Sequence, residues 1–331
     1  MKKKSAFLKF IVSISVLFLL FNKFNLSLDN FHGYTLSKRY VFFALLVGLI
    51  FTPIISTNRW KLFLSVSGIQ ESTWSLWRIN WISAFLGLVL PSAQGFDVIR
   101  MYYIEQRHPE YRGKPGSTVL IERMLGLGLL CSLSLCAFPF LDNPPPLTIF
   151  IILAVCLSGF AAIMLVLHPF FYKLYATRKS SNKFLNRALS FIQSTHAAII
   201  NFPFRQVMLS SLLLIACFQL LTVLSVYFIF RAYGYHIPFI KHLALYPIIG
   251  TLSLVPITIG GFGVREGFFV YFYNTLGIPA EISISVSIVN YLVLTLVPAL
   301  FGGLFLLLDS FKTDKLLTAQ AQTIDKPDHA L

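Results

Sequence analysis

Residues 253–265 read S-L-V-P-I-T-I-G-G-F-G-V-R, and Glu266 follows directly. The proline in this stretch ends an incoming helix, because it lacks an N–H donor and its ring clashes with the preceding turn. Three glycines then permit the unusual backbone that a restarting helix needs. The new helix begins with unpaired N–H groups beside an arginine and a glutamate. Such a break inside apolar sequence predicts two helices that meet within a membrane, against protein or a wet cavity rather than lipid tails.

The composition is that of a membrane protein. Of the 331 residues, 56% are hydrophobic and 12% are charged, against about 25% charged in soluble domains, and the mean hydropathy is +0.74. Several apolar runs reach the ~18 residues that a spanning helix needs. We therefore expect an all-α polytopic integral membrane protein. The formal charge of +14 comes mostly from short loops, where the positive-inside rule explains it, and we expect no nucleic-acid partner.

The apolar runs predict about six full transmembrane helices, at roughly residues 7–25, 40–57, 118–141, 147–167, 207–230 and 281–308. Residues 168–206 carry six basic side chains and no acid, so this loop is expected in the cytoplasm. We count membrane crossings from this loop and from a cytoplasmic N-terminus. The count places both flanks of residues 79–100 on the cytoplasmic side. It places both flanks of residues 243–277 on the outer side. We therefore predict two opposed re-entrant helical hairpins; eight ordinary spans are the alternative.

The two short segments share one spacing. They read L-P-S-A-Q-G-F-D-V-I-R at 90–100 and V-P-I-T-I-G-G-F-G-V-R at 255–265. A proline, a glycine four residues later and an arginine five residues after that recur as Pro91, Gly95 and Arg100, and as Pro256, Gly260 and Arg265. Together with the opposed entry sides, this spacing indicates an inverted-topology repeat, an architecture that many transporters use.

Two helix N-termini and two guanidinium groups around a wet cavity would make an anion site. The planar fork of arginine suits a phosphate bidentately, and a charge at the bilayer centre costs about 2.5–3.5 kcal/mol on insertion scales. The alternative is that each arginine pairs with its acidic neighbour or snorkels to the surface. Asp97 and Arg100, three residues apart, can pair directly. Arg265 and Glu266 are adjacent and do not face each other on a helix, so we expect other partners for them.

Two further patterns lie near the first hairpin and in the long basic loop. Arg59, with Lys61 and Arg78, is interpreted as a loop charge that favours the cytoplasmic side. The tryptophans before this hairpin are interpreted as an interfacial belt: Trp60, Trp74, Trp77 and Trp81. Residues 183–200 place apolar side chains at helical spacing, which predicts a short amphipathic helix on the cytoplasmic surface.

The motifs resemble the transmembrane flippase domain of lysylphosphatidylglycerol synthases. They are T-V-L-I-E-R-M-L-G-L (118–127), P-I-T-I-G-G-F-G-V-R-E (256–266) and the preceding L-P-x3-G-x-D-x2-R. The resemblance covers about residues 5–310, and G-G-F-G-V-R-E is its most specific element. Phe96 departs from the pattern, because relatives often have a glycine there that allows close backbone approach. The chain stops at Leu331 without the aminoacyl-transferase domain of the fused enzymes, which indicates a stand-alone member.

The resemblance implies a lipid-handling membrane module. Residues 1–310 would form the flippase-like domain, and residues 311–331 a polar, disordered cytoplasmic tail. The candidate substrate-binding residues are Asp97, Arg100, Glu122, Arg123, Arg265 and Glu266. The candidate backbone breaks and anion-binding positions are Pro91, Gly95, Pro256, Gly260, Gly261 and Gly263. We expect no catalytic residue, no metal and no cofactor.

The leading hypothesis is a transporter that moves a phosphate-containing lipid headgroup between leaflets through an arginine-lined cavity. The alternative is a membrane-embedded transferase, or an accessory subunit, acting on polyprenyl-phosphate-linked or other lipids. The expected partner is a membrane phospholipid or a polyprenyl-linked lipid. If the protein is an accessory subunit, we also expect a separate lipid- or glycan-modifying enzyme as a partner. The sequence is compatible with a homo-oligomer. The protein is expected in the cytoplasmic (inner) membrane of the cell, with both termini in the cytoplasm.

Overall fold

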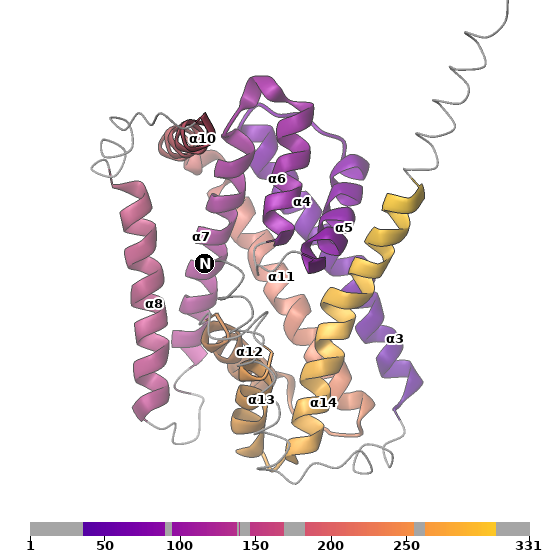
Figure 1. Cartoon of the computed structure of the whole chain (residues 1–331). Coiled ribbons are helices and arrows are strands. Elements are labelled where there is room, and N and C mark those ends of the chain that lie inside the picture. Colours follow the sequence, from indigo (N-terminus) through magenta and orange to yellow (C-terminus); the bar gives the residue numbers. More distant parts are fainter. Residues whose placement is uncertain are drawn as a thin grey trace, which may run out of the picture.

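All regular secondary structure in the described part of the chain is helical. The computed structural model describes residues 36–89, 95–137, 139, 146–168, 183–254 and 262–308. Its first half contains α3 (Lys38–Leu46), α4 (Thr52–Val66), α5 (Thr73–Val89), α6 (Gly95–Arg107), α7 (Lys114–Ala137) and α8 (Pro146–Leu167). The second half contains α10 (Lys183–Ile200), α11 (Phe204–Ala232), α12 (Phe239–Leu252), α13 (Val264–Asn274) and α14 (Ala280–Tyr291) (Figure 1). Short π-helical segments, η1 (Val47–Phe51) and η5 (Leu292–Leu296), continue α3 into α4 and extend α14.

Four described helices are long and apolar enough to cross a bilayer. They are Lys38–Val66, Lys114–Ala137, Phe204–Ala232 and Ala280–Leu308, and each contains or overlaps a predicted span. Helix α8 coincides with the span predicted at 147–167. These helices confirm the polytopic, all-helical membrane fold. The predicted span 7–25 and the predicted tail 311–331 lie outside the described residues.

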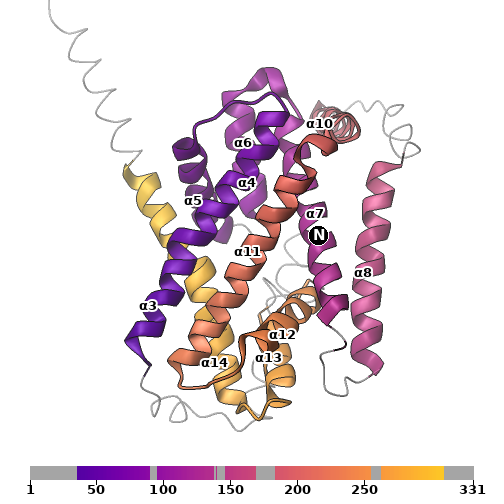
Figure 2. The ribbon, with the colours of Figure 1, turned by 180° about the vertical axis from the view of Figure 1, so that it is seen from behind.

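The short segments form hairpins. At the first, Glu71 just before α5 contacts His108 just after α6, with 3.2 Å between Oε1 and Nε2. At the second, His242 near the start of α12 lies 2.9 Å from the hydroxyl of Tyr273 near the end of α13. Each helix pair therefore begins and ends at the same end of the molecule. The α5–α6 hairpin occupies the upper half of the bundle in Figure 1 and the α12–α13 hairpin the lower half, and Figure 2 agrees. The structure thus has two opposed hairpins where the alternative of eight spans had two ordinary crossings.

The order of elements repeats with inverted direction. A long helix (α3 to α4), a hairpin (α5–α6) and a second span (α7) are followed by a long helix (α11), a hairpin (α12–α13) and a span (α14). The first hairpin enters from one end and the second from the other (Figure 2). Helices α8 and α10 lie between the two halves of the chain and have no counterpart in this repeat.

The predicted break positions are described in part. Gly95 is the first residue of α6, and Gly263 precedes α13 with a φ of 84°, a left-handed backbone that glycine adopts without steric cost. Pro91, Pro256, Gly260 and Gly261 lie outside the described residues.

Glycines allow the first hairpin to pack closely. A Cβ on Gly87 of α5 would lie 2.7 Å from the backbone nitrogen of Phe96. Relatives often have a glycine at the position of Phe96. In this chain, Gly87 of α5 is the glycine that allows the backbones of α5 and α6 to approach closely. A Cβ on Gly302, in the extension of α14, would lie 1.8 Å from the carbonyl oxygen of Trp81. The hairpin is thus held against both its own return helix and the last span.

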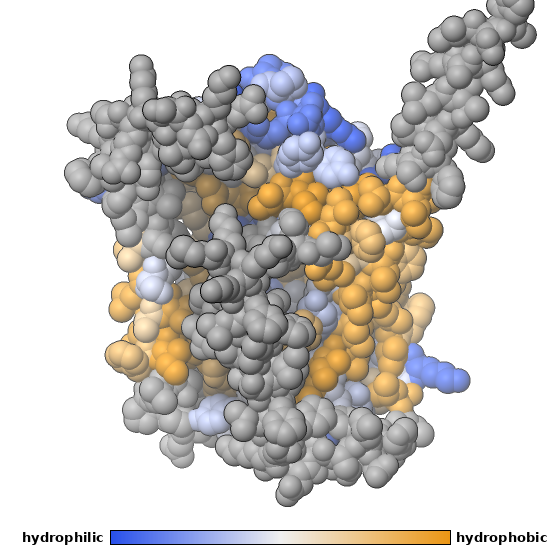
Figure 3. Space-filling model, in the orientation of Figure 1, coloured by the Kyte–Doolittle hydropathy of each residue, from blue (hydrophilic) through white to orange (hydrophobic). Residues whose placement is uncertain are grey.

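One end of the molecule is polar. In Figure 3 a hydrophilic patch covers the upper end, and hydrophobic side chains cover much of the visible flank. Burial alone would raise the pKa of Glu71 at this end, but hydrogen bonds from Ser75 and His108 and the charge of Arg107 lower it below its ordinary value. Helix α10 has the bounds predicted for the amphipathic helix and crosses this end (Figure 1). Its binding to lipid remains a prediction.

Candidate functional site

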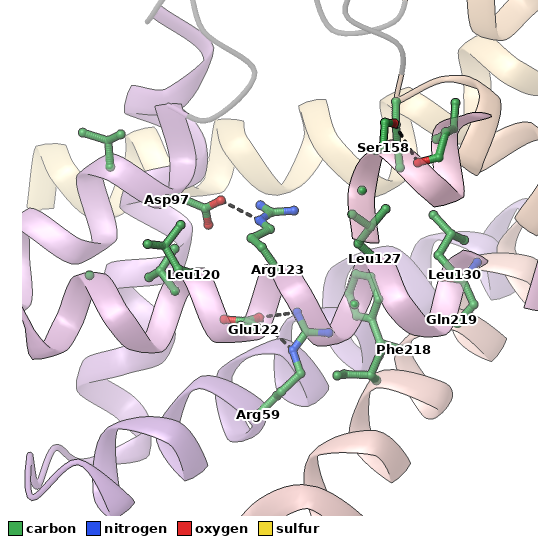
Figure 4. A pocket seen from close by; sticks show the side chains of 18 of the residues that line it. Arg59, Asp97, Leu120, Glu122, Arg123, Leu127, Leu130, Ser158, Phe218 and Gln219 are labelled. Atoms are coloured by element: carbon green, nitrogen blue, oxygen red, sulfur yellow. Dashed lines mark hydrogen bonds and ion pairs between the residues drawn. The ribbon is translucent and has the colours of Figure 1, made fainter. Parts of the chain in front are cut away.

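Five charged side chains form one continuous network below the polar end. They come from three helices: Arg59 from α4, Asp97 and Arg100 from α6, and Glu122 and Arg123 from α7. Arg59 Nε donates to Glu122 Oε1 at 2.7 Å, and Arg100 Nη2 donates to Glu122 Oε2 at 2.8 Å. Arg100 Nη2 also lies 2.8 Å from Asp97 Oδ1, and Arg123 Nε donates to Asp97 Oδ2 at 2.6 Å. Figure 4 shows the Arg59–Glu122 and Arg123–Asp97 contacts.

The network lies within the depth of a bilayer. Arg59 precedes the end of α4 at Val66 by seven residues, and Glu122 follows the start of α7 at Lys114 by eight. A rise of 1.5 Å per residue places both about 10–12 Å below the polar helix ends, and the hydrocarbon core is about 30 Å thick. Charges at such depth are costly unless they are paired or serve a site.

Arg100 is buried behind the other members of the network. Its side chain is 1% exposed. Its guanidinium carbon lies 4.9 Å from the ring centroids of both Trp60 and Phe96. Within the described ranges, its Nε and Nη1 have no hydrogen-bond partner. Two carboxylates and two aromatic rings therefore fix Arg100 in place.

A cavity of about 1200 Å³ opens beside the network. Its charged lining residues are Arg59, Asp97, Glu122 and Arg123, so Arg100 and Arg265 are not among them. Most of the remaining wall is apolar, contributed by α6, α7, α8, α10 and α11. In Figure 4 the charged groups gather together, and Leu127, Leu130 and Phe218 continue the wall beyond them. The cavity therefore joins an ionic end to a hydrocarbon-like wall.

Arg123 is the cation of the network that is most open to the cavity. Its side chain is 55% exposed, whereas that of its partner Asp97 is 7% exposed and that of Arg59 is 12% exposed. The contact with Asp97 uses Nε of Arg123, which leaves the two Nη groups for another ligand. Thr195 of α10 also lines the cavity, and within the described chain its buried hydroxyl has no hydrogen-bond partner.

Arg265 belongs to a second network at the start of α13. Its Nη2 lies 2.7 Å from Glu266 Oε1, and its Nε donates to Ser287 Oγ at 3.0 Å. Glu266 Oε2 accepts the Gly263 N–H at 2.6 Å. Both residues have the other partner that was expected, because Ser287 also donates to Glu266 Oε1 at 2.9 Å. The expectation that they do not face each other is wrong. As the capping residue of α13, Glu266 turns back over the first turn, where the long side chain of Arg265 reaches the same carboxylate.

The two networks occupy matching places in the repeat. Arg100 bonds Glu122, eight residues into α7, and Arg265 bonds Ser287, seven residues into α14. Each hairpin arginine thus reaches the same level of the span that follows it. Only in the first half, as far as the structure describes the chain, does such a network border the large cavity.

Sequence reasoning missed Arg59 and misplaced Trp60. Arg59 was expected in a loop, but it lies within the long helix Lys38–Val66 and contacts Glu122. The apolar residues Phe63 and Leu64 beyond it were the signal that the helix continues. Trp60 was expected in an interfacial belt, but it is fully buried against Arg100.

Comparison with known proteins establishes the family. Residues 6–302 match the family described as the lysylphosphatidylglycerol synthase TM region. The chain belongs to this family. Among its described residues, no group of three or more His, Cys, Asp or Glu side chains is placed to hold a metal ion.

Two archaeal proteins resemble this member of the lysylphosphatidylglycerol synthase TM family over most of their length. The UPF0104 membrane protein MJ1595 of Methanocaldococcus jannaschii is 22% identical over 294 residues, which cover 84% of this chain and 87% of the relative. The UPF0104 membrane protein PH1989 of Pyrococcus horikoshii is 23% identical over 310 residues, covering 86% and 90%. No solved structure matches the chain significantly.

Proposed function

We propose that this protein moves a phosphate-bearing lipid between the two leaflets of its membrane. The headgroup is held by Arg123 and Arg59, and the acyl chains lie along the apolar wall. One observation carries the proposal: the cavity joins the exposed guanidinium group of Arg123 to hydrocarbon-lined space at membrane depth. Its volume of about 1200 Å³ exceeds the roughly 300–1,000 Å³ of small-molecule pockets, which suits a headgroup together with part of its chains.

The arginine chemistry favours a phosphate. A guanidinium presents parallel N–H donors that match two phosphate oxygens, and it remains charged in apolar surroundings. Asp97 accepts from Nε of Arg123 and thereby orients the side chain. The sequence-based proposal gave the headgroup to Arg100 and Arg265; the cavity favours Arg123 and Arg59 as the contacting residues. Arg100 then serves as a fixed counter-charge for Asp97 and Glu122.

The repeat supports transport rather than storage of the lipid. Opposed hairpins in an inverted repeat are the architecture with which many transporters expose one site alternately to the two sides. In this chain the network attaches the first hairpin to α7 through Arg100 and Glu122. A tilt of that hairpin would therefore move Asp97 and Arg100 relative to Arg59 on α4 and Arg123 on α7, and would change the headgroup site.

Reconstitution tests the proposal. Purified protein in liposomes is given phosphatidylglycerol with a fluorescent label, and a membrane-impermeant quencher reports which leaflet holds the label. We expect Arg123→Gln to slow transfer by at least about tenfold, since a lost charge-assisted contact costs more than the 1.4 kcal/mol that this factor represents.

Arg107→Gln is the matched control, because Arg107 contacts Glu71 at the polar end and does not line the cavity. It should transfer lipid at the native rate. Native transfer by Arg123→Gln would refute the site. Metal-dependent formation of a modified lipid would instead favour the transferase alternative.

A further inference from the structure

We infer that the cavity selects a lipid whose phosphate carries a single negative charge, a phosphodiester, over a phosphomonoester. The inference rests on the proposed function, since it assumes that the headgroup phosphate binds beside Arg123. It adds the substrate class, and it comes from the charge balance of the network.

The network has a net charge of +1. Three guanidinium groups (Arg59, Arg100 and Arg123) and two carboxylates (Asp97 and Glu122) are joined by the contacts described above, so the sum is 3 − 2 = +1. All other described residues that line the cavity are uncharged. The hairpin tips 90–94 and 255–261 contain no charged residue in the sequence.

Each carboxylate is already paired with two guanidinium groups. Asp97 lies between Arg100 and Arg123, and Glu122 between Arg59 and Arg100. Neither can move away from an incoming phosphate without breaking an ion pair at membrane depth. An arriving anion therefore meets the open side of Arg123 with Asp97 close behind it, and the network has one positive charge to balance it.

A diester and a monoester then differ sharply. A phosphodiester carries one negative charge and brings the network to neutrality. A phosphomonoester carries about −1.5 to −2 at neutral pH and leaves excess negative charge beside Asp97 and Glu122. Unbalanced charge in an apolar environment is strongly unfavourable.

The test is a competition experiment on the full-length protein in detergent micelles. Fluorescent phosphatidylglycerol is displaced by unlabelled phosphatidylglycerol or by phosphatidic acid with the same acyl chains. We expect native protein to prefer phosphatidylglycerol by at least about tenfold, the factor that 1.4 kcal/mol produces.

Two variants change the balance without removing a cation. Asp97→Asn and Glu122→Gln each raise the network to +2, and each should shift the preference towards phosphatidic acid by about tenfold or more. Glu110→Gln is the control, because this exposed residue contacts His108 and does not line the cavity. It changes the protein's charge equally and should leave the preference at the native value.

The outcomes separate this inference from the proposed function. If native protein binds phosphatidic acid as well as phosphatidylglycerol, or if both folded variants keep the native preference, the charge-balance inference is wrong and the lipid site stands. If neither lipid displaces the probe specifically, the proposed function fails as well. The native comparison decides the inference even if a variant does not fold.

Discussion

Arg100 and Arg123 belong to one network, yet they differ in environment. The side chain of Arg100 is 1% exposed and contacts both carboxylates, whereas that of Arg123 is 55% exposed and contacts one. A buried cation that balances two acids stabilises the fold, and an exposed one is free to bind a ligand. Substitution of Arg100 should therefore reduce stability, and substitution of Arg123 should reduce lipid binding.

We expect Arg100→Ala to lower the free energy of unfolding by about 3–5 kcal/mol, because it leaves buried carboxylates without their shared partner. Arg123→Ala should lower it much less, by about 1 kcal/mol, since the buried Asp97 keeps Arg100 as its partner, while lipid transfer is lost. Thermal unfolding in detergent measures both. A native-like melting temperature for Arg100→Ala, or a large drop for Arg123→Ala, would contradict these roles.

The sequence predicted the local contacts of these residues better than the distant ones. Asp97 and Arg100 are three residues apart on a helix, and their predicted pairing is confirmed at 2.8 Å. Arg59 and Glu122 are 63 residues apart, and no local pattern indicates that α4 and α7 pack together. The spacing rule failed for Arg265 and Glu266 because capping at the start of α13 overrides ordinary helix-surface geometry.

At the scale of the elements, close helix contacts hold the first hairpin at its depth. Gly302 brings the last span against the backbone of Trp81 in α5, and there is no room for a methyl group. The aromatic rings of Trp77 and Trp81 pack against Phe305 on the same span. The hairpin thus depends on a glycine contact with a span that contributes no residue to the five-residue charged network.

Gly302→Ala should destabilise the protein by about 1–3 kcal/mol, because the added methyl overpacks a backbone contact. Gly128→Ala is the matched control: it lies on α7, and its Cβ would meet nothing within 4 Å. Unfolding curves in detergent compare the two. Equal stability of both variants would mean that the α5–α14 contact is looser than the structure shows.

The hairpins themselves could be predicted from the sequence, whereas the length of the helix Lys38–Val66 could not. Half-length apolar runs ending at prolines and a count of loop charges indicated both hairpins. The predicted span 40–57 ended before the polar run Asn58, Arg59 and Lys61, but the helix continues to Val66. It continues because Glu122, on another helix, balances Arg59, and a single-segment pattern carries no such information.

At the scale of the whole molecule, the hairpins make a topological prediction. If the alternative of eight ordinary spans were correct, residues 67–72 and 108–113 would face opposite sides of the membrane. In the structure they contact each other through Glu71 and His108. The same reasoning places residues 233–238 and 275–279 together at the other end, as the contact between His242 and Tyr273 indicates.

Single cysteines at Ser72 and Glu110, placed in a background without the four native cysteines, should react with an impermeant maleimide from the same side. Cysteines at Tyr235 and Thr275 should react from the opposite side. The four native cysteines are free, so their removal breaks no disulfide. Labelling of positions 72 and 110 from different sides would contradict the hairpin.

The repeat could be predicted from spacing, but the position of the open cavity could not. Both halves carry a hairpin arginine that bonds the following span. The cavity lies beside the first network because α8 and α10, which have no counterpart in the repeat, contribute its walls. The sequence repeat alone therefore predicts two equivalent sites. Helices α8 and α10, which are outside the repeat, form a cavity at only one of the two described networks.

The central claim is that the cavity beside Arg123 holds a lipid phosphate, and an experimental structure in nanodiscs that contain phosphatidylglycerol tests it most directly. We predict density for a phosphate within hydrogen-bond distance of the Arg123 guanidinium, with an acyl chain along Leu127 and Phe218. Lipid density confined to the outer surface of the bundle, with none inside the cavity, would contradict the account.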